Sequence, residues 1–331
     1  MARVAVAQQV ETARRFCEAC RLQVLTGQAD PDRLYYWSFR CLDAERSGDS
    51  PLGAYEAHLA RMRRLESDLA TRAAAGLARA DETAQARFYV CEAEYWLGLI
   101  RGSAAGSFGG AAPADDQLDE LRGALLGAAE AAWVGCRARF KSEGKGLEGA
   151  CLASVRLLQA GRDAGHDERA CYEAHLERVL ELDRELRRRE RQGGVTPLDV
   201  AVGEYFRWEA EYMHGLAAPK RGRSPEAFAE RRYAASKEAY RGLRGGFRCG
   251  EGISERMYLW SLRWMRAQRD LDEERGQAPN ERATLADHLE RMAGFRNHLR
   301  AELPPGVSVD LGALDYFVME AEAWLAGLPP A

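Results

Sequence analysis

The sequence has no long apolar run and no excess of charge of one sign. Its apolar stretches fall short of the about 18 residues that a membrane-spanning helix needs, and its start, MARVAVAQQVETARRF, lacks the apolar core of a secretory signal. The 47 basic and 51 acidic residues are mixed along the chain and leave a net charge of -4. This balance gives no strong field for nucleic acid or an acidic membrane. We therefore expect a soluble, cytoplasmic protein with no nucleic-acid partner and no membrane insertion.

Motifs for nucleotide binding and for common hydrolytic chemistry are also missing. There is no Gly-x-x-x-x-Gly-Lys-Ser/Thr phosphate loop, no Gly-x-Gly-x-x-Gly following a strand, no Gly-x-Ser-x-Gly elbow and no His-Glu-x-x-His zinc motif. The sequence therefore predicts no catalytic residue, no bound cofactor and no metal site, and a protein that is not an enzyme.

Disulfide-rich architecture is not indicated, although the chain has eight cysteines. They are scattered through helical pattern in a chain that is neither short nor rich in loops. Cys17 and Cys20 form a Cys-x-x-Cys pair with no second pair at zinc-ribbon spacing. We expect reduced, half-buried thiols, and a redox or metal role for this pair is the alternative.

The pattern that is present is helical throughout. Good helix formers dominate, and apolar residues recur at three- and four-residue spacing, as at Leu59, Met62, Leu65 and Leu69. No stretch alternates β-branched and polar residues as a strand does. Helix starts are expected where proline follows a capping residue, and these pairs are Asp30-Pro31, Ser50-Pro51 and Thr196-Pro197.

Three stretches of the sequence align with one another. YEAHLARMRRLESDL begins at Tyr55, YEAHLERVLELDREL at Tyr172 and LADHLERMAGFRNHL at Leu285. Each is preceded by Ser-x-Arg and followed by a glycine (Gly76, Gly193 and Gly306) and then Glu-Ala-Glu. Such self-similarity is typical of repeat proteins. We predict an all-α fold of three tandem repeats of long antiparallel helical hairpins, forming an elongated bundle, with repeats at 8–101, 117–218 and 225–328 and a flexible linker at 102–116.

The charged residues that recur in the repeats form a structural signature. They are Arg40, His58, Arg61, Glu92 and Glu94 in the first repeat, Arg156, His175, Arg178, Glu209 and Glu211 in the second, and Arg263, His288, Arg291, Glu320 and Glu322 in the third. The two carboxylates of each Glu-Ala-Glu point in nearly opposite directions on a helix, so only one can face the interior. A buried glutamate needs a partner. We therefore expect the arginine of Ser-x-Arg to clamp that glutamate within each repeat.

A metal site is the sharper alternative for the three recurring histidines. Di-iron bundles use two Glu-x-x-His pairs together with two further glutamates. Only Glu211 and His214 have that spacing here, and the other repeats have no copy of it. A lone histidine near a helix start is more often a hydrogen-bonded packing residue.

The sequence also contains several bands of aromatic residues and one run of basic residues. Tyr35-Tyr36-Trp37 is one such band, and its members are expected in the core, with a few exposed rings as contact anchors. The run Arg187-Arg188-Arg189-Glu190-Arg191 has acidic residues one turn away, which favours a solvated helix face.

The half-repeats share a glycine, a short polar turn, a helix start led by Asp or Glu, and a later Glu-Ala-x-x-x-Leu, with Asp199-Val200-Ala201 as the nearest match to an Asp-Val-x-x-Ala start. In this they resemble the helical repeats of TolC-type outer-membrane efflux proteins. The resemblance covers about a quarter of the chain and is confined to the helical part. It implies long antiparallel hairpins and transfers no functional residue, and the chain has three repeats where that family has two.

The even spread of the signature along the chain favours a binding role. An active site concentrates perturbed groups in one cleft, whereas a repeat distributes them. We predict a non-enzymatic helical-repeat scaffold or adaptor that acts through protein–protein interaction or self-association. The alternatives are a metal- or cofactor-binding helical bundle with oxidoreductase activity, and a TolC-like helical tube component.

Overall fold

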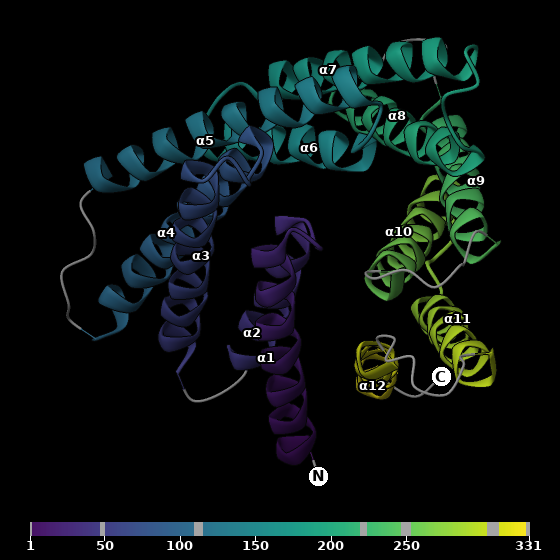
Figure 1. The fold of residues 1–331 in the computed structure, drawn as a ribbon. Coiled ribbons are helices and arrows are strands. Elements are labelled where there is room, and N and C mark those ends of the chain that lie inside the picture. Colours follow the sequence, from purple (N-terminus) through teal and green to yellow (C-terminus); the bar gives the residue numbers. More distant parts are fainter. Residues whose placement is uncertain are drawn as a thin grey trace. The chain divides into compact units, whose positions relative to one another are not determined.

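The computed structural model describes residues 2–46, 50–108, 115–218, 224–245, 253–302 and 311–328, and every regular element within them is an α-helix (Figure 1). The all-α prediction is confirmed. The helices are α1 (Ala2–Thr26), α2 (Pro31–Glu45), α3 (Pro51–Ala74), α4 (Ala80–Phe108), α5 (Asp115–Glu143), α6 (Leu147–Asp163), α7 (Glu168–Glu190), α8 (Pro197–Ala217), α9 (Pro225–Gly245), α10 (Ile253–Glu274), α11 (Glu281–Glu302) and α12 (Leu311–Gly327).

Proline sets the first residue of three helices, as the sequence predicts. Helices α2, α3 and α8 begin at Pro31, Pro51 and Pro197, where a missing N–H has no consequence for the helix ladder. At α8 the preceding Thr196 and the later Asp199 cap each other reciprocally. Asp30 was expected to cap α2, but its side chain makes no capping hydrogen bond.

The recurring glycines end helices outright. Gly76 and Gly193 have φ of 71° each, a conformation that glycine adopts without strain. The next residue then bonds back to the last turn, with Leu77 N donating to the Arg72 carbonyl at 2.8 Å and Gly194 N to the Arg189 carbonyl at 3.0 Å. The third glycine, Gly306, lies outside the described residues.

The predicted linker at 102–116 is partly helical. Helix α4 continues to Phe108 and α5 starts at Asp115, and residues 109–114 lie outside the described part of the chain. The alanines in this segment explain the extension, because alanine has the highest helix propensity of all residues.

The chain divides into two compact units, Met1–Asp167 with helices α1 to α6 and Glu168–Ala331 with helices α7 to α12. Within each unit, helices that follow one another along the chain pack together. Because the division falls after α6, it lies inside the second predicted repeat, 117–218.

Each unit has its own aromatic and aliphatic core. In the first unit the stripe Leu59, Met62, Leu65 and Leu69 is buried, as predicted. The largest fully buried side chains in the two units are Trp37, Phe88, Tyr89, Phe140, Phe206, Tyr258, Trp260 and Phe317. The aromatic bands therefore supply much of the core.

Two further features concern the cysteines and the apolar helices. Cys17 and Cys20, expected to be half-buried, are buried thiols on α1, where a hydrogen bond with the Cys41 thiol lowers the pKa of Cys17. No helix in the described ranges is both long and apolar enough to cross a bilayer.

Candidate functional site

The first repeat contains a buried network of Ser38 on α2 with His58 and Arg61 on α3. Ser38 Oγ lies 2.8 Å from His58 Nδ1, and Arg61 Nε donates to the same Oγ at 2.8 Å. Arg61 Nη2 also donates to the Ser38 carbonyl oxygen at 3.3 Å. The Ser38 hydroxyl has one proton and two acceptor lone pairs, so it can donate to Nδ1 or accept from it while it also accepts from Arg61. Burial, with the Arg61 charge, lowers the pKa of His58 to about 3, so the ring is neutral at neutral pH.

The third repeat contains the same network in almost the same geometry. Ser261 Oγ lies 2.8 Å from His288 Nδ1, and Arg291 Nε donates to that Oγ at 2.7 Å. Arg291 Nη2 reaches the Ser261 carbonyl oxygen at 3.3 Å. In the middle repeat Ser154 and His175 lie on α6 and α7, in separate compact units, and each is buried.

An aromatic stack accompanies both networks. Tyr35 stacks on Tyr89 with ring centroids 4.2 Å apart, and Tyr258 stacks on Phe317 at the same 4.2 Å. The neighbouring histidine stacks on a tryptophan in each case, His58 on Trp96 at 5.9 Å and His288 on Trp324 at 6.3 Å. Histidine, serine and arginine therefore act as packing elements of the core here, and the bonds among them use Nδ1, Oγ and Nε, whereas His58 Nε2 is buried without a hydrogen-bond partner among the described residues.

The first glutamate of each Glu-Ala-Glu bonds to a tyrosine. Tyr35 Oη donates to Glu92 Oε2 at 2.6 Å, Tyr205 Oη to Glu209 Oε1 at 2.8 Å, and Tyr258 Oη to Glu320 Oε2. Of the second glutamates, Glu94 pairs with Arg63 at 2.9 Å, Glu211 is half-buried and Glu322 is exposed. The remaining signature residue, Arg178, is half-buried on α7.

The arginine of Ser-x-Arg contacts an aromatic ring in each of the three repeats. Arg156 pairs with Asp32 of the first repeat at 2.9 Å, so this contact crosses a repeat boundary and does not stay within one repeat. Arg40 Nε donates to Tyr36 Oη at 3.0 Å, and the Arg263 guanidinium lies 4.5 Å from the Trp260 ring centroid. The flat guanidinium group accounts for these contacts, because it stacks on aromatic faces as readily as it binds carboxylates.

Arg156 also borders a cavity of about 300 Å³ formed by α4, α5 and α6. Its polar wall includes Glu92, Arg156 and Asp163, and its apolar wall includes Phe88, Trp96 and Leu125. Burial, with the Asp163 charge, raises the pKa of Glu92 to about 7, although the Tyr35 hydrogen bond and the Arg156 charge oppose this. A carboxyl group that titrates near neutral pH inside a cavity marks a candidate functional site.

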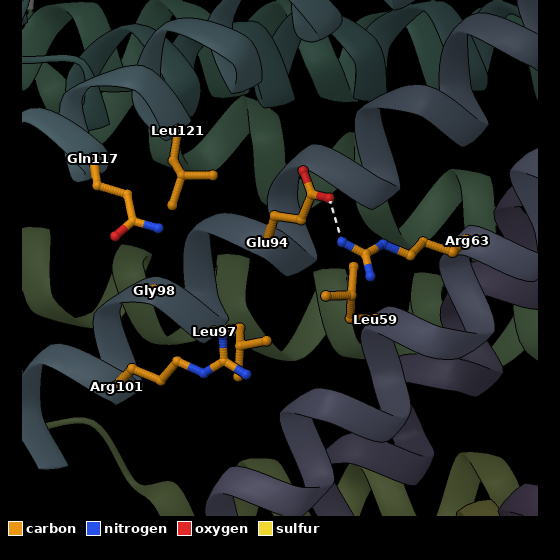
Figure 2. A pocket seen from close by; sticks show the side chains of 8 residues that line it. All are labelled: Leu59, Arg63, Glu94, Leu97, Gly98, Arg101, Gln117 and Leu121. Carbon is orange, nitrogen blue, oxygen red and sulfur yellow. Dashed lines mark hydrogen bonds and ion pairs between the residues drawn. The ribbon is translucent and has the colours of Figure 1, made fainter. Parts of the chain in front are cut away.

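A second, more open groove of about 440 Å³ lies between α3, α4 and α5 (Figure 2). Leu59, Leu97 and Leu121 supply its apolar surface, and the Arg63–Glu94 ion pair and Arg101 add charge, as the sticks in Figure 2 show. The cavity and the groove use opposite faces of α4, because at about 100° per residue Glu92 and Trp96 point away from Glu94 and Leu97.

The basic run on α7 is neutralised by neighbouring acids. Arg187 pairs with Glu204 at 2.8 Å, and Arg188 and Arg189 share Glu185 at 2.6 and 2.7 Å. These hydrogen bonds lower the pKa of Glu185 to about 2. The face is therefore a network of ion pairs, as the acidic residues one turn away predict.

Among the described residues, no three or more His, Cys, Asp and Glu side chains gather as they would around a metal ion. His214, the histidine of the Glu-x-x-His spacing, is buried on α8. Comparison with known proteins adds no assignment, because no family model matches the sequence and no curated protein is significantly similar to it.

Proposed function

We propose that the chain is a non-enzymatic scaffold or adaptor that binds other proteins through its helical surfaces. The groove between α3, α4 and α5 carries this proposal, because it combines an apolar floor with a charged rim (Figure 2). Protein interfaces are built in this way, with an apolar centre enclosed by polar residues. A partner helix that presents apolar side chains at three- and four-residue spacing fits such a groove.

The use of the signature residues supports a structural role for them. The His58 and His288 networks are buried and bonded internally, and neither histidine borders the cavity or the groove. The Ser–His–Arg networks thus hold helices in register, whereas Glu94 of the same signature lies on the groove. We further propose that the three sequence repeats encode one recurring helical motif, since the first and third build the same Ser–His–Arg network and aromatic stack.

A photo-crosslinking amino acid at Gln117, on the rim of the groove, tests the proposal. We expect discrete adducts with a partner, or with a second copy of the chain, that disappear with Leu121→Glu. The matched control position is Glu130, which is exposed on the same helix outside the groove. Equal adducts at Gln117 and Glu130, or adducts unaffected by Leu121→Glu, would contradict the proposal, provided circular dichroism shows that the helices are intact.

Light scattering with small-angle X-ray scattering tests the assembly that the scaffold forms. A monomer or a dimer in solution would agree with the adaptor that we propose. A closed, hollow oligomer would instead favour the helical tube that the TolC-type resemblance implies.

A further inference from the structure

Charged side chains that line the cavity between α4, α5 and α6 make fewer hydrogen bonds with the protein than they are able to. Arg156 makes one side-chain hydrogen bond among the described residues, from Nη2 to Asp32 at 2.9 Å. Its guanidinium is held in place by the rings of Tyr35, Phe88 and Tyr89, with centroids 5.4, 5.6 and 5.0 Å away. The donors on Nε and Nη1 are therefore fixed in position and available to a ligand in the cavity.

The carboxylates of the same cavity complement this cation. Glu92 accepts one hydrogen bond, from Tyr35 to Oε2, and Asp163 accepts one from Gln159 Nε2 to Oδ1 at 2.9 Å. Each carboxylate oxygen has two lone pairs, so both groups keep acceptor capacity. The cavity thus offers fixed donors from Arg156 and acceptors from Glu92 and Asp163 within about 300 Å³.

We propose that this cavity binds a small zwitterion of the α-amino acid class. The ligand carboxylate bonds to Arg156, its ammonium group to Glu92 and Asp163, and an apolar side chain packs against Phe88, Trp96 and Leu125. The site lies on the face of α4 opposite the groove, so it does not depend on the proposed protein partner.

Charge and size both select this class of ligand. An anion alone would be repelled by Asp163, and a cation alone would be repelled by Arg156. A ligand with both charges satisfies both walls, and buried ions need such partners. A volume of about 300 Å³ is at the small end for ligand sites, which excludes cofactors of dinucleotide size.

Binding is coupled to ionisation of Glu92. The groups that act on it are Tyr35 from α2 and Arg156 and Asp163 from α6, whereas α5 presents the apolar Leu125. A ligand ammonium group stabilises the ionised carboxylate, so binding below pH 7 releases a proton from Glu92.

Calorimetry with the full chain tests the proposal, after a thermal-shift screen of the twenty amino acids. We expect at least one apolar amino acid to bind, and its amine and its carboxylic acid analogues, each lacking the other charged group, to bind at least tenfold more weakly. Proton release at pH 6.5 should appear as a difference between buffers of different ionisation enthalpy. Absence of binding by all twenty would overturn the proposal, as would an amine or acid analogue that binds as tightly as the amino acid.

Variants on the two faces of α4 separate this site from the groove. We expect Glu92→Gln to weaken amino acid binding at least tenfold and to abolish proton release, because the amide still accepts from Tyr35 but carries no charge. The matched control Glu94→Gln, on the groove face, should leave binding unchanged. Gln159→Trp, at an exposed position bordering the cavity, should block binding without a change in the core. Unchanged binding in Glu92→Gln and Gln159→Trp would refute the assignment, whatever the crosslinking at Gln117 shows.

Discussion

Glu92 makes the stability of the protein depend on pH in a direction opposite to that of most carboxylates. Its pKa rises from an ordinary 4.5 to about 7 in the folded protein because the carboxyl group is removed from water. The folded state therefore holds the Glu92 proton more tightly than the unfolded chain does. The stability that protonation provides is complete below pH 4.5 and is lost as the pH rises through 7.

The size of the effect follows from the difference between the two pKa values. At about 1.4 kcal/mol per pKa unit, the rise from 4.5 to about 7 corresponds to at most about 3.5 kcal/mol. Because Glu92 is half-buried, solvent screening reduces the expected value to about 1–3 kcal/mol. Glu92→Gln removes the charge and keeps an acceptor for Tyr35, so the variant should be more stable than the wild type by this amount at pH 8.5 and equally stable at pH 4.5.

Urea unfolding followed by circular dichroism, at several values between pH 4.5 and 8.5, measures the difference. The matched control is Glu94→Gln, two residues away on the same helix, where the carboxylate pairs with Arg63 and faces the groove. We expect no such gain at high pH in the control. A difference between Glu92→Gln and the wild type that stays constant across this range would refute the argument that burial controls the Glu92 proton.

Three further predictions concern the core. Ser38→Ala and Ser261→Ala should each lower the free energy of unfolding in urea by about 1–3 kcal/mol, because each removes the hydroxyl that a buried histidine and an arginine share. A change near zero would show that the network does not contribute to stability. His58, whose pKa is about 3, should show constant ring nitrogen chemical shifts between pH 5 and 8 in NMR, and a titration in that range would contradict its burial. Gly135→Ala should destabilise the protein by about 1–3 kcal/mol, because the added Cβ would lie 3.0 Å from the Asp81 Cα on α4. The control Gly127→Ala, whose added Cβ would meet open space, should stabilise the protein by up to about 1 kcal/mol. Equal shifts in melting temperature for the two variants would refute the close approach of the helices at Gly135.

Local sequence signals predict the helices of this chain well. Pro31, Pro51 and Pro197 begin helices, and Gly76 and Gly193 end them, because each residue acts on its own backbone and needs no distant neighbour. The all-α class follows from the same signals.

The contacts of the signature residues were harder to predict. Alignment of the repeats shows that Ser38 and His58 recur. It does not show that they bond to each other, because the Ser-x-Arg motif associates the serine with Arg40. A repeat pattern in the sequence shows which face of a helix is buried. It does not show which residue of a neighbouring helix contacts that face. The two bonded pairs lie 20 and 27 residues apart in the sequence, so no fixed spacing identifies them.

The cavity was missed for a related reason. It is formed by three helices, and Arg156 reaches it from the second repeat to meet Asp32 and Glu92 of the first. The sequence predicts a clamp between this arginine and a glutamate of the same repeat, whereas Arg156 pairs with Asp32 and Glu92 accepts from Tyr35. It could not show that the arginine contacts the preceding repeat, because a periodic pattern does not specify which helices pack against α6.

The boundary between the compact units determines where the chain is best divided. A fragment that ends at Asp167 retains Arg156 together with Asp32, whereas a fragment that ends with the first repeat at residue 101 exposes Tyr35, Phe88 and Tyr89 to water. The sequence repeats and the compact units are thus out of step by half a repeat, and a fragment boundary chosen from the repeats alone would cut through a packed core.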